Sequence, residues 1–240
     1  MKIQKFAIIL AVIGILTVFT SCRSITHIRG NGDMVTSERT VSAFEKIQIS
    51  GSAVVNYRAS QEYRVAVTVD SNLEEYTRVY TDGNVLKIGT KNGKSYSFTN
   101  YIVDVYCPTL SAVSSSGAVR FNGIDKIVAS TFTLGISGSG KVNGTFECNK
   151  FEADISGSGE IDVSGFAKEM NVSVSGSVTF NGKEFQTNNA AVTVSGSGRI
   201  HIWVLDYLKA KVSGSGKVTY RGNPKIDYST SGSGRLESEA

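Results

Sequence analysis

The tetrapeptide Ser-Gly-Ser-Gly recurs at nearly constant spacing through the second half of this chain of 240 residues. Copies begin at residues 137, 156, 195, 213 and 231, and a shortened copy, Ser175-Gly176-Ser177, stands between the second and the third. Successive starts are therefore 19, 19, 20, 18 and 18 residues apart. A fixed period of this kind indicates one small structural unit that is used repeatedly. Such a unit is too thin to bury an apolar face by itself, so the units must stack on one another.

Apolar and polar residues alternate on both sides of each repeated turn, which is typical of strands with one buried face. The inward positions before the turns are Phe132, Leu134, Ile136, Phe151, Ala153, Ile155, Met170, Val172, Val174, Ala190, Val192, Val194, Leu208, Ala210 and Val212. The first inward positions after the turns are Val142, Ile161, Val178, Ile200, Val218 and Leu236. Glycine adopts positive φ without steric cost, so the paired glycines can turn the corner of every unit.

These features predict an all-β chain that forms a right-handed parallel β-helix, or β-solenoid, with about 18–20 residues per rung. A β-sandwich of hairpins is the alternative architecture. Hairpins would favour Asn-Gly or Asp-Gly turns and would not need a fixed register. The regular repeat therefore favours the solenoid.

The segment 40–109 is also rich in alternating residues but lacks the strict repeat. Tyr63–Val69 and Tyr101–Cys107 read as strands, and Asp70 is placed to cap a short helical turn over Ser71–Tyr76. We expect this less regular β region to cover the N-terminal end of the repeat coil at 110–240, so that 40–240 forms one continuous domain. Residues 22–39 read as a polar tether.

The N-terminus has the features of an export signal. Lys2 and Lys5 precede an apolar run over 7–19, and small residues then lead into Cys22. The run is shorter than the roughly 20 residues of a membrane-spanning helix. Phe19-Thr20-Ser21-Cys22 resembles a bacterial lipobox, which implies removal of 1–21 and acylation of Cys22, for example with palmitate. The alternative is an ordinary signal peptide with an incidental cysteine.

The charge and the cysteine content limit which partners, disulfides and cofactors can be expected. Removal of 1–21 leaves 23 basic and 21 acidic residues, a net charge of 23 − 21 = +2 without charged blocks, so nucleic acid is not an expected partner. Cys107 and Cys148 remain, and Cys107 continues the inward alternation of its strand. We predict two buried thiols, with a disulfide in an oxidising compartment as the alternative. No Cys/His spacing indicates a metal, and no cofactor is expected.

One stretch resembles a known family. The strand Tyr101–Cys107 ends in Pro108-Thr109-Leu110, and Ser116-Gly117-Ala118 follows before the Ser-Gly-Ser-Gly turns begin. This order is similar to the head-GIN domain family of auto-transporter adhesins, over roughly 40–236. The resemblance implies a β-helical fold, a cell-envelope location and an adhesin function, and it supplies no catalytic residues. Cys107 departs from the family pattern, in which an apolar or β-branched residue is expected.

Two sets of side chains are candidates for binding. Lys141, Arg199, Lys217 and Arg235, with Glu160 inserted, follow the turns and would form a row that could meet an anionic polysaccharide. The alternative is a solvated face that keeps the stack soluble. His201, Trp203 and Tyr207, and the aromatic stretch 94–101, offer flat platforms for sugars or proteins. Alternatively, Trp203 packs over a bend between rungs.

Enzymatic function has weaker support. β-Helical polysaccharide lyases and hydrolases need clustered carboxylates, and Glu152, Asp154, Glu160 and Asp162 are the nearest candidates. Neighbouring rungs add no further acids, and the Gly-Lys pairs lack the spacing of a phosphate loop. The leading hypothesis is a non-enzymatic outer-membrane lipoprotein that binds carbohydrate or a surface protein. A polysaccharide-active enzyme and a structural envelope protein are the alternatives.

Overall fold

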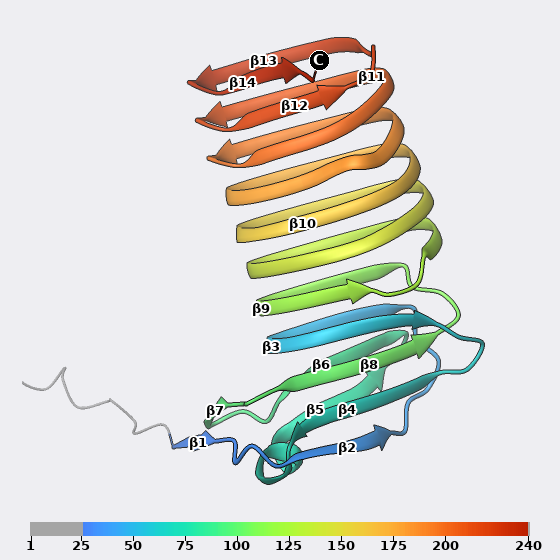
Figure 1. Ribbon diagram of the computed structural model, residues 1–240, viewed down its shortest axis with the longest axis vertical. Helices are drawn as coiled ribbons and strands as arrows, with labels where there is room; N and C mark the ends of the chain where they lie inside the picture. The colour runs from blue at the N-terminus through green and yellow to red at the C-terminus, as the bar shows by residue number, and fades with distance from the viewer. Residues whose placement is uncertain (1–25, 240) are drawn as a thin grey trace, which may run out of the picture.

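The computed structural model describes residues 26–239, and within them the prediction of an all-β chain is confirmed. The predicted signal sequence and the predicted lipidation site Cys22 lie outside the described residues. Within 26–239, twelve strands form one long mixed sheet, and β1 (His27–Arg29) and β7 (Ser95–Ser97) form a small parallel sheet. The helical content of these residues is a single 3-10 turn, η1 (Ser71–Tyr76) (Figure 1). No helix within 26–239 has the length and hydrophobicity needed to span a bilayer.

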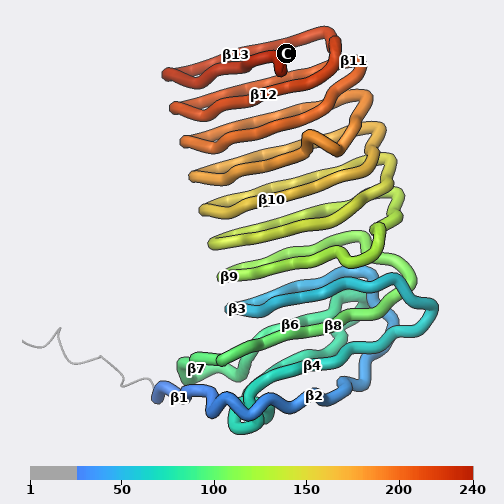
Figure 2. The backbone as a smooth tube through the Cα atoms, viewed as in Figure 1, coloured from blue at the N-terminus to red at the C-terminus, as the bar shows by residue number. Residues whose placement is uncertain are grey.

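The repeat region coils so that each turn stacks on the turn before it (Figure 2). Its centre is β10 (Ile127–Gly196), a strand of 70 residues that winds through several turns without interruption. All neighbours in the stack pair in parallel. They are β3 (Lys46–Ala59), β9 (Ala112–Gly123), β10, β11 (Arg199–Gly214), β12 (Lys217–Arg221), β13 (Lys225–Gly232) and β14 (Arg235–Ser238).

Every corner of the stack contains a glycine with positive φ. These glycines lie between φ 91° at Gly51 and φ 131° at Gly117. From Gly117 onward, a side chain at this position would collide with the backbone of the corner glycine one turn earlier. The second glycine faces inward at Gly140, Gly198, Gly216 and Gly234: a side chain on Gly216, for example, would meet the methyl group of Val194 at 2.5 Å, whereas one on Gly159 would meet the backbone of Gly140. The paired glycines therefore allow the turns to approach closely.

Val178 is buried as predicted, but its expected equivalence to Ile200 is wrong. Thr179 pairs with Arg199 and Phe180 pairs with Ile200. Val178 therefore takes the place of the second corner glycine. The reason is the shortened copy itself, in which Val178 directly follows Ser175-Gly176-Ser177 where the other copies have a second glycine.

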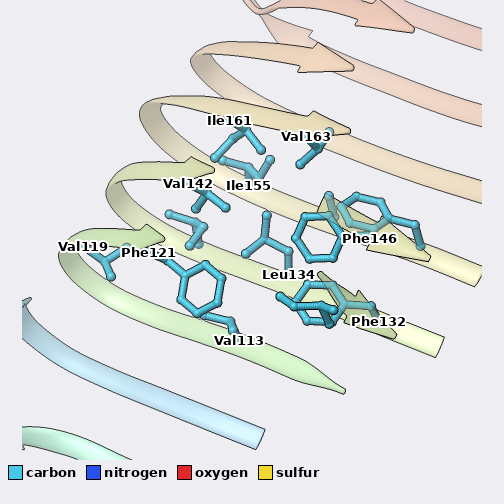
Figure 3. Packing of buried hydrophobic residues seen from close by; sticks show 14 of the residues in the cluster. Val113, Val119, Phe121, Phe132, Leu134, Val142, Phe146, Ile155, Ile161 and Val163 are labelled. Atoms are coloured by element: carbon cyan, nitrogen blue, oxygen red, sulfur yellow. The ribbon is translucent and has the colours of Figure 1, made fainter. Parts of the chain in front are cut away.

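The interior of the coil is filled by the predicted ladders (Figure 3). Aromatic side chains dominate one region, where the Phe146 ring centroid lies 4.6 Å from that of Phe132 and 5.2 Å from that of Phe151. Cys107 and Cys148 are also buried, and both are free thiols, as predicted. Burial raises the pKa of Cys107 to about 12 and that of Cys148 to about 11.

Antiparallel strands cover the N-terminal end of the stack. β3 belongs to the stack itself, because it pairs with β9 from Lys46 to Tyr57. The covering strands pair antiparallel as β2–β4, β4–β8 and β5–β6. They are β2 (Met34–Arg39), β4 (Arg64–Asp70), β5 (Thr77–Asp82), β6 (Val85–Thr90) and β8 (Tyr101–Cys107).

The predicted tether at 22–39 is wrong from residue 27 onward. β1 pairs with β7, and β2 completes the sheet beside β4. The hydroxyl oxygens of Thr36 and Thr68 lie 2.8 Å apart across this last pair. The segment reads as polar because β2 has no fully buried residue, yet its backbone pairs with the free side of β4.

Candidate functional site

A shallow groove of about 730 Å³ lies beside the glycine corners at the N-terminal end of the stack. One wall is the segment 96–101, which includes the end of β7 and the start of β8. The opposite side is made of corners from successive turns. The lining residues are Ser52, Ala53, Val54, Tyr96, Ser97, Phe98, Thr99, Asn100, Tyr101, Ala118, Val119, Arg120, Ser139, Gly140, Lys141, Ser158 and Gly159.

The wall of the groove is a continuous aromatic row. Ring centroids are 5.3 Å apart for Tyr76 and Tyr96, 6.1 Å for Tyr96 and Phe98, and 4.9 Å for Phe98 and Tyr101. Tyr101 is buried, and its hydroxyl donates a hydrogen bond of 2.8 Å to the carbonyl of Gly89. Burial raises the pKa of Tyr101, so this hydroxyl stays protonated. Tyr96 and Phe98 remain half-buried and offer apolar surface to the groove.

The carboxylate of Asp70 holds this wall in place. It is fully buried, and it accepts hydrogen bonds of 2.8 Å from the backbone amides of both Gly32 and Thr99. Burial alone would raise the pKa of Asp70, but the hydrogen bonds from Thr99 and Gly32 outweigh it and hold the pKa below its ordinary value. Asp70 precedes η1 as predicted, although its side chain does not cap that helical turn. It joins the N-terminal segment to the groove wall instead.

The opposite side of the groove is polar and positively charged. Ser52, Ser139 and Ser158 line it together with Arg120 and Lys141, and no carboxylate is among the lining residues. Lys141 is paired with Glu160 on the next turn at 2.8 Å. Arg120 has no ion-pair partner within 26–239. The groove therefore combines an apolar aromatic surface with an available guanidinium group.

Members of the predicted basic row are register partners on neighbouring strands, but only part of the row lines the groove. Arg199, Lys217 and Arg235 are successive partners on β11, β12 and β14. Lys217 and Arg235 both pair with Glu237, at 2.7 Å and 2.8 Å. Lys141 is the predicted member that lines the groove. Its register partner Arg120 was missed, because it follows a diverged turn without the Ser-Gly-Ser-Gly motif.

His201, Trp203 and Tyr207 do not form a common platform. His201 and Trp203 lie on the part of β11 that pairs with β12, whereas Tyr207 lies on the part that pairs with β13. The Trp203 ring is covered by the Arg221 guanidinium, 4.3 Å from the ring centroid. His201 is half-buried, and burial together with the nearby Lys183 lowers its pKa. None of the three lines the groove.

The carboxylates suggested for catalysis are dispersed. Glu152 pairs with Lys150, Glu160 pairs with Lys141, and Asp162 accepts a hydrogen bond from Asn181. Asp154 lies on the other side of the corner from Asp162. Residues 26–239 contain no group of three or more His, Cys, Asp or Glu side chains that could hold a metal ion.

Solved structures with the same fold come from Bacteroides and Parabacteroides species. A "putative adhesin" of Bacteroides fragilis superposes with a TM-score of 0.83 at 20% identity, covering 88% of this chain and 100% of the other. A "putative lipid binding protein" of Parabacteroides distasonis gives a TM-score of 0.73 at 24% identity, covering 90% of this chain and 100% of the other. A "putative adhesin" of Parabacteroides distasonis gives 0.67 at 27% identity, covering 89% of this chain and 100% of the other.

The family suggested by the sequence is confirmed. A comparison with curated proteins finds no match. The family model described as "Putative auto-transporter adhesin, head GIN domain" matches residues 43–224, which is most of the chain and includes β3 to β12. The chain therefore belongs to the head-GIN family of auto-transporter adhesins.

Proposed function

We propose that this protein is a non-enzymatic lipoprotein of the outer membrane whose head, a right-handed β-solenoid, binds anionic glycans in the groove beside Tyr96 and Arg120. Family membership supports an adhesin at the cell surface or envelope. The glycan ligand and the lipid anchor are the parts of the proposal that go beyond family membership. The groove carries the proposal, because it brings together three chemical features that sugar acids require.

Each feature of the groove matches a part of such a ligand. The half-buried faces of Tyr96 and Phe98 suit the apolar C–H face of a sugar ring. The hydroxyls of Ser139 and Ser158 suit its hydroxyl groups. Arg120 suits a carboxylate or sulfate, because guanidinium binds such groups through two parallel hydrogen bonds.

The proposed anchor places this groove close to the membrane. Five residue steps separate Cys22 from His27, the first residue of β1. An extended chain covers about 3.3–3.6 Å per residue, so acylation of Cys22 would hold β1 within roughly 18 Å of the membrane surface. β1 pairs with β7, and Ile28 is the register partner of Tyr96 in the groove wall. This geometry favours glycans of the envelope over ligands far from the cell.

A glycan array tests the proposal. The mature chain in detergent is applied to carboxylated, sulfated and neutral glycans, and we expect binding to the acidic sets only. Tyr96→Ala and Arg120→Glu should each lower affinity by about tenfold or more. Arg199→Glu is the matched control, since Arg199 is exposed, lies outside the groove and has no ion pair within 26–239. A blank array with folded protein, or an equal loss in the control, overturns the proposal.

A further inference from the structure

A second hollow continues the groove along the same face of the stack. It has a volume of about 420 Å³ and is lined by Asn143, Gly144, Thr145, Asp162, Val163, Ser164, Asn181, Lys183 and Glu184. Two neighbouring segments of β10, 139–145 and 158–164, contribute residues to both the groove and the hollow. Gly140 in the groove and Gly144 in the hollow are four residues apart, a distance of about 13 Å along a strand.

The floor of the hollow presents polar groups in rows across successive turns. The side-chain amide of Asn181 donates to Asp162 at 3.0 Å, and the hydroxyls of Thr145 and Ser164 lie 2.9 Å apart. The side-chain oxygen of Asn181 is buried, and no group within 26–239 donates to it. That oxygen is closed to solvent and faces the turn of His201, its register partner, so the groups that a ligand can reach are the exposed hydroxyls of Thr145 and Ser164. These hydroxyls suit a ligand that brings hydroxyl groups of its own.

The hollow differs from the groove in charge. Lys183 is neutralised by Glu239 at 2.9 Å, whereas Asp162 and Glu184 have no ion-pair partner within 26–239. The hollow is therefore acidic, and it disfavours a ligand group with negative charge. Carboxylate and amide groups side by side suit the neighbouring hydroxyls of an uncharged sugar. The groove, which contains Arg120 and no carboxylate, suits the acidic unit.

We propose that the groove and the hollow are two subsites for one extended glycan chain, with an acidic unit beside Arg120 and a neutral, hydroxyl-rich unit beside Asn181. The chain would lie along 139–145 and 158–164, parallel to the strands. This inference rests on the proposed function and specifies its ligand: a heteropolysaccharide in which acidic and neutral units are combined, bound along its length and not only at a terminal sugar.

Hyaluronan oligosaccharides are a suitable probe, because acidic and neutral units alternate along them. Affinities of the mature chain in detergent for the disaccharide and the hexasaccharide are measured by calorimetry. We expect the hexasaccharide to bind about tenfold more tightly, because it reaches the hollow. Asn181→Ala and Asp162→Ala should remove most of this difference and leave disaccharide binding unchanged. Thr219→Ala, a change on the same outer face two turns away from Asn181, should alter neither affinity.

The outcomes separate the two proposals. If the disaccharide and the hexasaccharide bind with equal affinity, and Asn181→Ala changes neither affinity, the second subsite is wrong. The proposal for the groove then still stands. A hexasaccharide of galacturonate, in which every unit is acidic, should bind more weakly than the hyaluronan hexasaccharide. If it binds equally well, the assignment of a neutral unit to the hollow is wrong. If hyaluronan does not bind but other acidic glycans on the array do, a ligand of alternating acidic and neutral units is wrong. If no acidic glycan binds, the proposed function itself is wrong.

Discussion

The carbonyl oxygen of Gly138 occupies the space in which a side chain on Gly157 would begin. Gly157 has φ 126°, a conformation that residues with a side chain rarely adopt. The same relation links Gly157 to Gly176 on the following turn. The corner of the stack is thus a column of backbone packed directly on backbone, which gives a physical reason for the repeated glycine.

Replacement of Gly157 should therefore be costly. We expect Gly157→Ala to lower the free energy of unfolding by roughly 3 kcal/mol, because backbone strain and overpacking add. Gly135→Ala is the control: its added carbon would lie at an ordinary 3.8 Å from Ser114, and its φ is not positive. The control should change stability by less than about 1 kcal/mol. Urea denaturation measures both, and equal losses would contradict the packing argument.

Asp70 should couple stability to pH. Its folded-state pKa lies below the ordinary value, so its stabilising contribution is complete at neutral pH. That contribution is lost as the pH falls below about 3.9 and through the folded-state pKa. We expect Asp70→Asn to cost about 2 kcal/mol at pH 7 and progressively less on acidification.

Urea denaturation across pH 2–7 checks the Asp70 prediction. Asp82→Asn is the matched control, because Asp82 is exposed and, among residues 26–239, pairs only with Lys87. It should leave the pH profile close to that of the unchanged protein. A constant difference between Asp70→Asn and the unchanged protein at all pH values would show that the carboxylate does not act through its charge.

The buried thiols should be inert in the folded protein. Only the thiolate reacts, and burial raises the pKa of Cys107 to about 12 and that of Cys148 to about 11. With Cys22→Ser in place, a disulfide-exchange reagent at pH 8 should label the native chain far more slowly than the chain in denaturant. Rapid native labelling of either cysteine would contradict its buried position.

The Lys141–Glu160 pair should contribute little to stability. The two side chains are 53% and 52% exposed, and solvent screens ion pairs of this kind. We expect Lys141→Ala to change the free energy of unfolding by less than about 1 kcal/mol. Thermal denaturation tests this, and a small effect means that any loss of glycan binding in the variant reports on the groove.

Acylation of Cys22 is testable in cells. A palmitate analogue supplied to the producing bacterium should label the protein, and Cys22→Ala should abolish the label. Cys107→Ala is the matched control and should retain it. Labelling that persists in Cys22→Ala would exclude this cysteine as the anchor.

The stacking of the repeat could be predicted because its signal is local and repeated. Every Ser-Gly-Ser-Gly corner indicates the same backbone geometry, and the alternation of apolar and polar residues beside it indicates which face of the strand is buried. The helical turn after Asp70 and the buried Cys107 were also readable from neighbouring residues. Val178 was buried as predicted but matched to the wrong partner, because the shortened copy has valine in place of the second glycine and a period-two pattern does not by itself fix the register.

The groove could not be predicted, because its parts are far apart in the chain. Asp70 binds amides that are 38 residues before it and 29 residues after it. Arg120 comes from a diverged turn, and the aromatic wall folds back against it from 96–101. Sequence pattern alone predicts exposed rings at His201 and Trp203 as well as in the stretch 94–101, so it does not single out the stretch that forms the wall. The strands within 27–39 were missed because pairing with β4 and β7 depends on their backbones more than on apolar side chains.

The parallel register also has a consequence for how such molecules change in evolution. Each turn of the coil contacts chiefly the turn before it and the turn after it. Duplication or deletion of a whole turn beyond the groove would therefore leave the groove and the final strands unchanged. The length of the stack can thus change in steps of one strand spacing, about 4.8 Å for each turn.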